Sequence, residues 1–517
     1  MSIPGPGTPI IIDIGSAYAK VGFAGEPTPR FIFPSITGTE KYKSVMADVS
    51  TRSIYVGNDA MKMRGVLKVK HPVERAQIMS WDDYYEILNH IFYTLLRIEN
   101  LNAYPVFYVE PSFIQKETKE YIARIMFETH RVQSLIMVPS PILSIFSVGL
   151  ISGLVIESGH GITTIVPIVN GQIYYQGIQK LNLAGQDIIQ NLRTLLMREG
   201  ISISSSAVDE ILREIVEKNC YYILNPNDAA ITSEQFHYPM PDGSFISIPQ
   251  NILYRAPEVL FQPGLMNSNL PSIPQAIISS LYTINNAYWG DLLSHIVLSG
   301  GNLSYPGFEE RLKGELDQLL PQLGPIPKPR NDEKSNITPF IQELKPLQKE
   351  LKSVMSGTKE EDTCSKCGTL VKLSDGKEFC PNCGAPMKVQ EISIDLGLGK
   401  KKEPTLVKGK CPHCHKEIKD ETSLFCPYCG KKIENIEMSD ISEKVMKQTP
   451  ANEFTSFYES SDTSSIIKFF VPDNLLHSTF NGASILGSLP SFLGLFITHA
   501  EFQTNPTLLY QDISQIF

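Results

Sequence analysis

Eight of the nine cysteines form two four-cysteine sets, and this pattern constrains the chain more than any other feature. Each set consists of two C-x2-C pairs, separated by 12 residues in the first set and by 11 in the second. A C-x2-C pair brings two thiolates to one side of a tight turn, and two such turns complete a tetrahedral sulfur site that suits Zn²⁺. The predicted zinc ligands are Cys364, Cys367, Cys380 and Cys383 in the first set, and Cys411, Cys414, Cys426 and Cys429 in the second.

Cysteine fills every position of both sites, which leaves no open position for water. We therefore predict two structural Zn²⁺ ions, and binding of about 10–16 kcal/mol then supplies most of the folding free energy of each ribbon. The chain opens with MSIPGPGT, which lacks the pattern of a secretory signal, so we expect a cytoplasmic protein with metal sites rather than disulfides. A redox dithiol pair and an iron centre are the alternatives. His413 and His415 flank Cys414 and could compete as ligands, but exposed loop histidines are the favoured interpretation.

The charge balance limits nucleic-acid binding to a local contact. The formal net charge of the chain is -9, and residues 326–465 hold 22 Lys+Arg against 22 Asp+Glu. Backbone binding to DNA or RNA needs a positive surface. A local lysine excess between residues 400 and 419 keeps a nucleic-acid contact open, although a solvated face of the linker and ribbon is the simpler interpretation.

Two uncharged stretches, residues 132–156 and 478–497, raise the question of membrane insertion. Both are interrupted by proline, glycine and serine, for example at Pro139 and Gly487. We expect core strands and helices joined by turns, and hence no membrane insertion.

A weak internal repeat links the sequences IIDIGS (residues 11–16) and VIESGH (residues 155–160). In both, a strand ends in an acid, a turn that contains glycine follows, and a second strand resumes. Two such turns can hold phosphates from opposite sides, while the acids Asp13 and Glu157 hold a hydrated divalent cation. Hairpins with glycine turns are common, so spacing alone leaves this interpretation open.

Seven segments resemble actin in the same order along the chain. They are GSAYAKVGFAGEPTPRFIFPSITG (15–38), YVGNDAMKMRGVL (55–67), WDDYYEILNHIFY (81–93), IMFETH (125–130), LNLAGQDI (181–188), PEVLFQPG (257–264) and VLSGGNLSYPGFEERL (297–312). The resemblance covers residues 8–320 and resumes at Ile466, including GASILGSL (482–489). It implies an α/β actin-like ATPase fold, in which two duplicated α/β domains enclose a cleft for ATP or ADP with Mg²⁺, with two small four-cysteine zinc ribbons inserted.

The resemblance also implies roles for individual residues. Asp13 would order the water shell of the metal, and Ser16 and Lys20 would contact the β and γ phosphates. The nucleotide-binding residues that match family positions are Asp13, Gly15, Ser16, Lys20, Ser158, Gly159, Gly161, Ile162, Gly185, Arg213, Glu217, Gly300, Gly301 and Tyr305.

The chain departs from the family around the attacking water. Actins place a glutamine, an aspartate and a histidine there, where this chain has Ser140, Glu157 and Thr164. Glu157 is the remaining catalytic candidate. We expect the rate of hydrolysis to fall more than the nucleotide affinity, because a small displacement of the nucleophile can lower the rate about 10²-fold. Further departures are His160 at a ribose contact, and Val216 and Leu476 beside the adenine.

The segment order predicts an actin-like body interrupted by one insertion. The expected parts are the body (1–325 and 466–517), a helical linker (326–360), the first zinc ribbon (361–390), a linker (391–407), the second zinc ribbon (408–435) and a last linker (436–465).

We expect an actin-related protein that serves as a nucleotide-responsive cytoskeletal or complex-scaffolding subunit. Its zinc-ribbon arm would recruit a protein partner, with actin or further copies of this chain as candidates. The sequence leaves slow ATP hydrolysis open. One alternative is an active filament-forming ATPase, favoured by the length of residues 38–55. The other is a nucleic-acid-associated module that acts through the ribbons.

Overall fold

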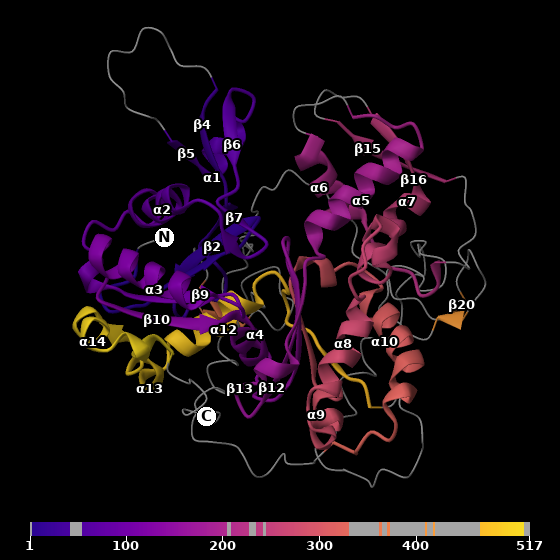
Figure 1. Cartoon of the computed structure of the whole chain (residues 1–517). Coiled ribbons are helices and arrows are strands. Elements are labelled where there is room, and N and C mark those ends of the chain that lie inside the picture. The colour runs from indigo at the N-terminus through magenta and orange to yellow at the C-terminus, as the bar shows by residue number, and fades with distance from the viewer. Residues whose placement is uncertain are drawn as a thin grey trace.

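Two lobes stand side by side, and the chain passes from the first to the second and back again (Figure 1). The computed structural model describes residues 3–41, 54–203, 208–226, 234–240, 245–329 and 466–510, and the four short strands β18 to β21 between residues 361 and 418. The C-terminal segment packs on the lobe that the N-terminal residues build, so both ends of the body belong to the first lobe.

A six-stranded sheet forms the centre of the first lobe. Its order is β23 (Ile497–Thr498), β10 (Ser134–Pro139), β9 (Pro105–Glu110), β1 (Ile10–Ile14), β2 (Tyr18–Phe23) and β3 (Phe31–Pro34). Strands β1, β9 and β10 run parallel, whereas β2 is antiparallel to β1. Every residue of β9 is buried, as expected for a central parallel strand that is covered on both faces.

The second lobe repeats this topology. Its sheet has the order β13 (Gln172–Ile173), β12 (Thr163–Val169), β11 (Gly153–Ser158), β17 (Ile296–Ser299) and β22 (Phe469–Phe470), with β14 (Gln179–Leu181) also paired to β12. The register is also repeated, because Asp13 pairs with Lys20 and Glu157 pairs with Thr164. The duplication expected from the internal repeat is therefore present in the fold.

Two helices carry the chain between the lobes. Helix α4 (Ser140–Ser147) leads from β10 to β11, and α12 (Ser478–Gly487) follows β22 and leads back. They pack closely, because a Cβ atom on Gly482 would lie 2.0 Å from the carbonyl oxygen of Leu143. An apolar core that contains residues of both sheets surrounds them, so the seam between the lobes is itself buried.

Smaller elements and helices complete each lobe. The first lobe carries α1 (Gly57–Lys62), α2 (Trp81–Asn89), α3 (Lys116–Arg124), α13 (Pro490–Leu493), α14 (His499–Thr504), the sheet of β4 (Thr37–Glu40), β5 (Ile54–Val56) and β6 (Leu67–Lys70), and the hairpin of β7 (Val73–Glu74) and β8 (Gln77–Ile78). The second carries α5 (Gly185–Arg198), α6 (Val208–Asn219), α7 (Gln250–Arg255), α8 (Ile273–Tyr282), α9 (Trp289–Leu293), α10 (Phe308–Leu319), and the hairpin of β15 (Gln235–Pro239) and β16 (Phe245–Pro249).

Both stretches that raised the membrane question belong to the core. Residues 132–156 form β10, α4 and most of β11, and residues 478–497 form α12, α13 and the start of β23. None of the helices in the described part of the chain is long and apolar enough to cross a bilayer. The expectation of strands and helices joined by turns is confirmed.

The insertion leaves the body and returns to it at one helix, α9. On the outgoing side, a Cβ atom on Gly290 would lie 2.1 Å from the carbonyl oxygen of Pro327. On the returning side, the Lys468 N–H donates to the Leu293 carbonyl at 3.2 Å. The two ends of the insertion are therefore close together on the surface of the second lobe.

Within the insertion, two antiparallel strand pairs occupy corresponding places. Strand β18 (Glu361–Thr363) pairs with β19 (Leu370–Lys372), and β20 (Gly409–Lys410) pairs with β21 (Glu417–Ile418). In both cases the strand pair brackets the first C-x2-C pair of one cysteine set. All eight predicted zinc ligands lie outside the described residues, as does most of the predicted helical linker.

Candidate functional site

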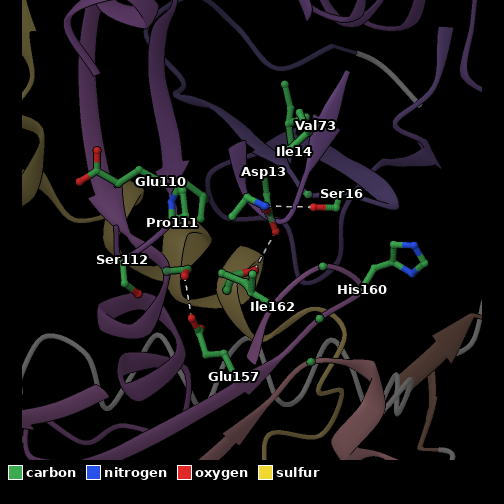
Figure 2. A pocket seen from close by; sticks show the side chains of 18 of the residues that line it. Asp13, Ile14, Ser16, Val73, Glu110, Pro111, Ser112, Glu157, His160 and Ile162 are labelled. Carbon is green, nitrogen blue, oxygen red and sulfur yellow. Dashed lines mark hydrogen bonds between the residues drawn. The ribbon is translucent and has the colours of Figure 1, made fainter. Parts of the chain in front are cut away.

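The cleft between the lobes contains two adjoining cavities. The first is lined by residues of both glycine turns, by both repeat acids and by the start of α12 (Figure 2). The second, of about 360 Å³, shares Gly15, Ser16, Gly159 and Gly300 with the first and extends toward α6. This volume lies within the usual range for small-molecule sites.

Two equivalent turns face one another across the cleft. In the first, the Gly15 N–H donates to the Tyr18 carbonyl at 3.0 Å, and in the second the Gly159 N–H donates to the Ile162 carbonyl at 3.2 Å. A Cβ atom on Gly161 would lie 2.7 Å from Ser16 Oγ, so the two turns approach as closely as glycine allows.

The second turn is braced from behind. The Asn302 amide donates to Ser158 Oγ at 2.9 Å and to the Gly159 carbonyl at 2.6 Å, and the Gly185 N–H donates to that carbonyl at 3.0 Å. Gly300 has φ of +94°, and a Cβ atom there would lie 2.3 Å from the Ser158 carbonyl. Glycine is required at position 300 by both its conformation and its surroundings.

Asp13 lies at the end of β1 and points into the first cavity (Figure 2). Its Oδ2 atom accepts from Lys20 Nζ at 3.1 Å and from Thr479 Oγ1 at 2.8 Å. Thr479 belongs to α12, so this carboxylate is bonded to one of the two helices that connect the lobes.

Glu157 lies at the equivalent place in the second lobe and is bonded to the other connecting helix. Its two carboxylate oxygens accept from Ser144 Oγ at 2.6 Å and from Ser140 Oγ at 2.7 Å, both on α4. Burial raises the pKa of Glu157, and the two hydroxyl donors oppose that rise. Each acid of the repeat is thus held by a hydroxyl of a different connecting helix.

The two replacements around the predicted attacking water also line the first cavity. The Ser140 hydroxyl is engaged with Glu157. Thr164 Oγ1 is buried and has no hydrogen-bond partner among the described residues. Neither side chain has the reach of a glutamine or a histidine.

The second cavity has one polar end and one apolar wall. Arg213, Glu217 and Tyr305 lie at the polar end, and Val216 and Leu476 form part of the wall. The Arg213 guanidinium lies 5.8 Å from the centre of the Tyr18 ring, and its buried Nε atom has no partner in the described part of the chain. Burial raises the pKa of Glu217, and the nearby Arg213 charge opposes this. A buried unpaired donor of this kind is suited to a polar ligand.

His160 stands where the two cavities join. Burial is the largest cause that lowers its pKa, to about 3, and the charges of Arg213, His71 and Arg75 lower it further. Both causes favour the neutral imidazole.

The structure brings together almost all the predicted nucleotide-site residues. Ser158 is the exception, since it lines neither cavity and its hydroxyl bonds to Thr163 at 2.8 Å. Sequence reasoning did not single out Thr479, Ser144, Arg75, Ala76 and His477. His477 and Thr479 adjoin Leu476, a position already aligned with the adenine pocket, but Arg75 and Ala76 carry no recognisable motif.

No set of three or more His, Cys, Asp and Glu residues within the described ranges can bind a metal without other ligands. The predicted cation site is of another kind, in which Asp13 and Glu157 would hold a hydrated cation together with phosphate oxygens. The described side chains do not include the predicted zinc ligands.

Comparison with known families gives two matches. The family model described as Actin matches residues 6–334, which is more than half of the chain. The model described as Double zinc ribbon matches residues 364–430, from the first predicted ligand cysteine to the residue after the last. A double zinc ribbon indicates zinc binding.

Proposed function

Because the chain belongs to the actin family, we propose that its cleft binds ATP or ADP with Mg²⁺ and that the nucleotide controls an actin-related scaffold protein. One observation carries the proposal: the two glycine turns meet across the cleft, with the Gly161 Cβ position 2.7 Å from Ser16 Oγ. Backbone N–H groups in two facing turns suit a polyphosphate. The adjoining second cavity then receives the nucleoside.

The residues around the cavities fit this ligand. Ser16 and Lys20 would hold the β and γ phosphates, since both line the first cavity and one carries a positive charge. Asp13 and Glu157 would hold water molecules of the cation, and a bound Mg²⁺ would neutralise phosphate charge. Arg213 has an unpaired buried Nε and would bind the polar part of the nucleoside.

We further propose that ATP hydrolysis is weak or absent. Positioning of the attacking water needs side chains that reach it from the walls of the first cavity. The Ser140 hydroxyl is already donated to Glu157, and Thr164 is too short to replace a histidine. Binding needs none of these groups, so nucleotide affinity is retained while turnover is reduced.

The zinc ribbons would act as an arm that recruits a protein partner. Support comes from the junctions, since the chain contacts α9 on both sides of the insertion, and the main sheets of both lobes contain no strand from residues 326–465. The arm would therefore leave the body and return to it at this one helix. Such an arm is suited to binding a partner or to obstructing one neighbour position in a filament.

The proposal is tested with the full-length protein. We expect saturable binding of Mg·ATP and Mg·ADP, phosphate release slower than that of filament-forming actin measured in parallel, and no sedimentation of the protein alone with ATP. Sedimentation together with fast phosphate release would favour a filament-forming ATPase. Binding of DNA or RNA that falls steeply with salt would favour action through nucleic acid.

A further inference from the structure

Three buried serine hydroxyls link Glu157 to helix α12. Ser144 Oγ, on α4, lies 2.6 Å from Glu157 Oε1 and 3.2 Å from Ser299 Oγ. Ser299 Oγ in turn lies 2.6 Å from the Oγ atom of Ser478, the first residue of α12. The three serines are at most 3% exposed, so bulk water cannot replace a hydroxyl that is lost from this chain.

The direction of these bonds follows from the number of protons. A hydroxyl has one proton to donate, and its oxygen accepts. The Ser144 proton belongs to the shorter bond, in which the acceptor is a carboxylate. Ser299 must then donate to Ser144, and Ser478 must donate to Ser299. Because hydroxyls in such a chain polarise one another, the chain strengthens the bond that holds Glu157.

The next residue of α12 holds the other acid of the repeat. Thr479 Oγ1 donates to Asp13 Oδ2 at 2.8 Å, and Lys20 Nζ donates to the same oxygen at 3.1 Å. Asp13 Oδ1 accepts no hydrogen bond from the residues that the structure describes. Asp13 lines the first cavity, so Oδ1 is the oxygen that remains for a water molecule of the cation.

The two acids suit a divalent cation. Burial is the first cause that raises the pKa of Glu157, and the charge of Asp13 raises it further. The two carboxylates are thus close enough to repel each other, and both line the first cavity. A divalent cation whose water molecules bond to both carboxylates offsets this repulsion.

The hydroxyl bonds fix the two acids to a rigid pair of helices. Helices α4 and α12 are in close contact, since a Cβ atom on Gly482 would lie 2.0 Å from the Leu143 carbonyl oxygen. The distance between the acids therefore changes only if the helices move relative to each other or a hydroxyl bond breaks. Mg²⁺ needs near-octahedral geometry and retains several water molecules, whereas Ca²⁺ accepts six to eight ligands in flexible geometry. Fixed acceptors match Mg²⁺ better than Ca²⁺.

We infer that Thr479 and Ser144 are positioning residues for the cation, which fix Asp13 and Glu157 relative to each other and so favour Mg²⁺ over Ca²⁺. This inference rests on the proposed nucleotide binding and deepens it. Ser144 lines neither cavity and acts only through Glu157. Thr479 lines the first cavity, but its proton is donated to Asp13.

Each connecting helix offers a matched control. On α12, Ser484 is buried and donates to the Glu26 carbonyl at 2.7 Å. On α4, Ser147 donates to the Ser144 carbonyl at 2.7 Å. Ser484 and Ser147 line neither cavity. If the hydroxyls only stabilise the helices, loss of these two should affect the cation preference as much as loss of the hydroxyls of Thr479 and Ser144. The positioning role predicts that the two controls leave the preference unchanged.

The test measures equilibrium dissociation constants of full-length protein for Mg·ATP and Ca·ATP, and the denaturant midpoint of the nucleotide-free protein. The variants are Thr479→Val, Thr479→Ser, Ser144→Ala, Ser484→Ala and Ser147→Ala. We expect the wild type to bind Mg·ATP about tenfold more tightly than Ca·ATP. In Thr479→Val, which keeps the shape of the side chain, Mg·ATP affinity should fall about tenfold and Ca·ATP affinity by less than about threefold. Ser144→Ala should change the ratio in the same direction, and Thr479→Ser should retain the preference.

A double-mutant cycle separates positioning of Asp13 from a direct contact with the ligand. If Thr479 acts through Asp13, Thr479→Val should cause no further loss of Mg·ATP affinity in the Asp13→Ala background. The same loss in both backgrounds would show that Thr479 contacts the ligand itself, and would overturn the positioning role.

Equal affinity of the wild type for Mg·ATP and Ca·ATP, or equal loss of both in Thr479→Val and Ser144→Ala, would overturn this inference while leaving nucleotide binding intact. Failure of the wild type to bind either complex would instead overturn the proposed function. If Thr479→Val does not fold, Ser144→Ala decides the question, because it removes the bond to the other acid. If neither variant folds, the ratio of the two constants in the wild type decides it.

Discussion

Ser140 Oγ donates a 2.7 Å hydrogen bond to Glu157, so the hydroxyl at a predicted water-positioning site is directed to the acid beside it. Glu157 is one methylene longer than the aspartate that actins carry there. The longer side chain reaches α4 and bonds to Ser144 as well. Glu157 and Ser140 are thus hydrogen-bonded to each other, and the Ser140 proton is not directed to a reacting water.

This relationship predicts that hydrolysis can be raised by restoring the lost groups. The double change Ser140→Gln with Thr164→His should increase the single-turnover rate of hydrolysis of bound ATP by about tenfold or more. The reason is that correct positioning of the nucleophile can change the rate about 10²-fold. Quenched-flow measurement of ADP formation checks this. Thr164→Val, which keeps the size of the native side chain, should leave the rate unchanged. An unchanged rate in a double variant that still binds Mg·ATP would contradict the diagnosis.

The aromatic surroundings of His130 predict a loss of stability in mild acid. His130 is 4% exposed and lies among Tyr85, Phe92 and Tyr93, and burial lowers its pKa to about 4. Between this pKa and the ordinary value near 6.5, the unfolded chain binds a proton that the folded chain does not, so stability falls as the pH falls. From pH 7 to pH 5 the contribution is about 2 kcal/mol.

Denaturant unfolding at pH 7 and pH 5 measures this effect. In His130→Phe the loss of unfolding free energy between the two pH values should be smaller than in the wild type by about 2 kcal/mol. His237→Phe is a control on an exposed histidine, whose ring bonds to Ser247. The same pH dependence in wild type and His130→Phe would show that His130 does not carry it.

The two cysteine sets predict two Zn²⁺ per chain. Elemental analysis of protein prepared without added metal should give two equivalents of zinc and no iron, since each set supplies four thiolates without a second molecule. Cys364→Ser and Cys426→Ser should each remove one equivalent and leave nucleotide affinity unchanged. Cys220→Ser is the matched control, because Cys220 is buried in the body. One equivalent of zinc in the wild type would contradict the prediction.

The position of α9 predicts that the insertion can be removed. Ile326 packs against the core of the second lobe, so replacement of residues 331–464 by a short Gly/Ser linker retains both junctions. We expect a soluble protein with unchanged Mg·ATP affinity that either assembles more readily or fails to bind a partner of the full chain. Sedimentation and affinity capture measure the two outcomes. The full-length protein prepared in the same way is the control. If it is soluble and the deletion protein is insoluble, the insertion belongs to the core.

The sequence predicted the parts of the site that follow from local sequence patterns. Asp13 and Glu157 end equivalent strands, and this could be seen from the repeat because an acid and a glycine turn follow an apolar strand in both copies. The family resemblance also places Ser158 at the ligand, whereas its side chain faces the interior. The alternation of side chains along β11 explains this, since Glu157 lines the cavity and its neighbour must point the other way.

The features of the site that the sequence did not predict depend on contacts between distant parts of the chain. Thr479 bonds to Asp13 across 466 positions of sequence, and Arg75 bonds to Asp187 across 112. Arg75 and Ala76 have positive φ, for which arginine and alanine have no local preference, so nothing in the sequence around residues 73–78 indicates the turn they form. Its conformation is imposed by the opposite lobe, which a reading of local patterns cannot supply.

The most direct test of the account is magnesium-dependent nucleotide binding by the cleft. Isothermal titration of full-length protein with ATP should show binding with Mg²⁺ that weakens in excess chelator. Asp13→Ala should weaken the Mg²⁺-dependent part, while Asp59→Ala, at an exposed carboxylate on α1, should not. Absence of ATP binding at millimolar concentration in the wild type, or identical binding with and without Asp13, would contradict the account.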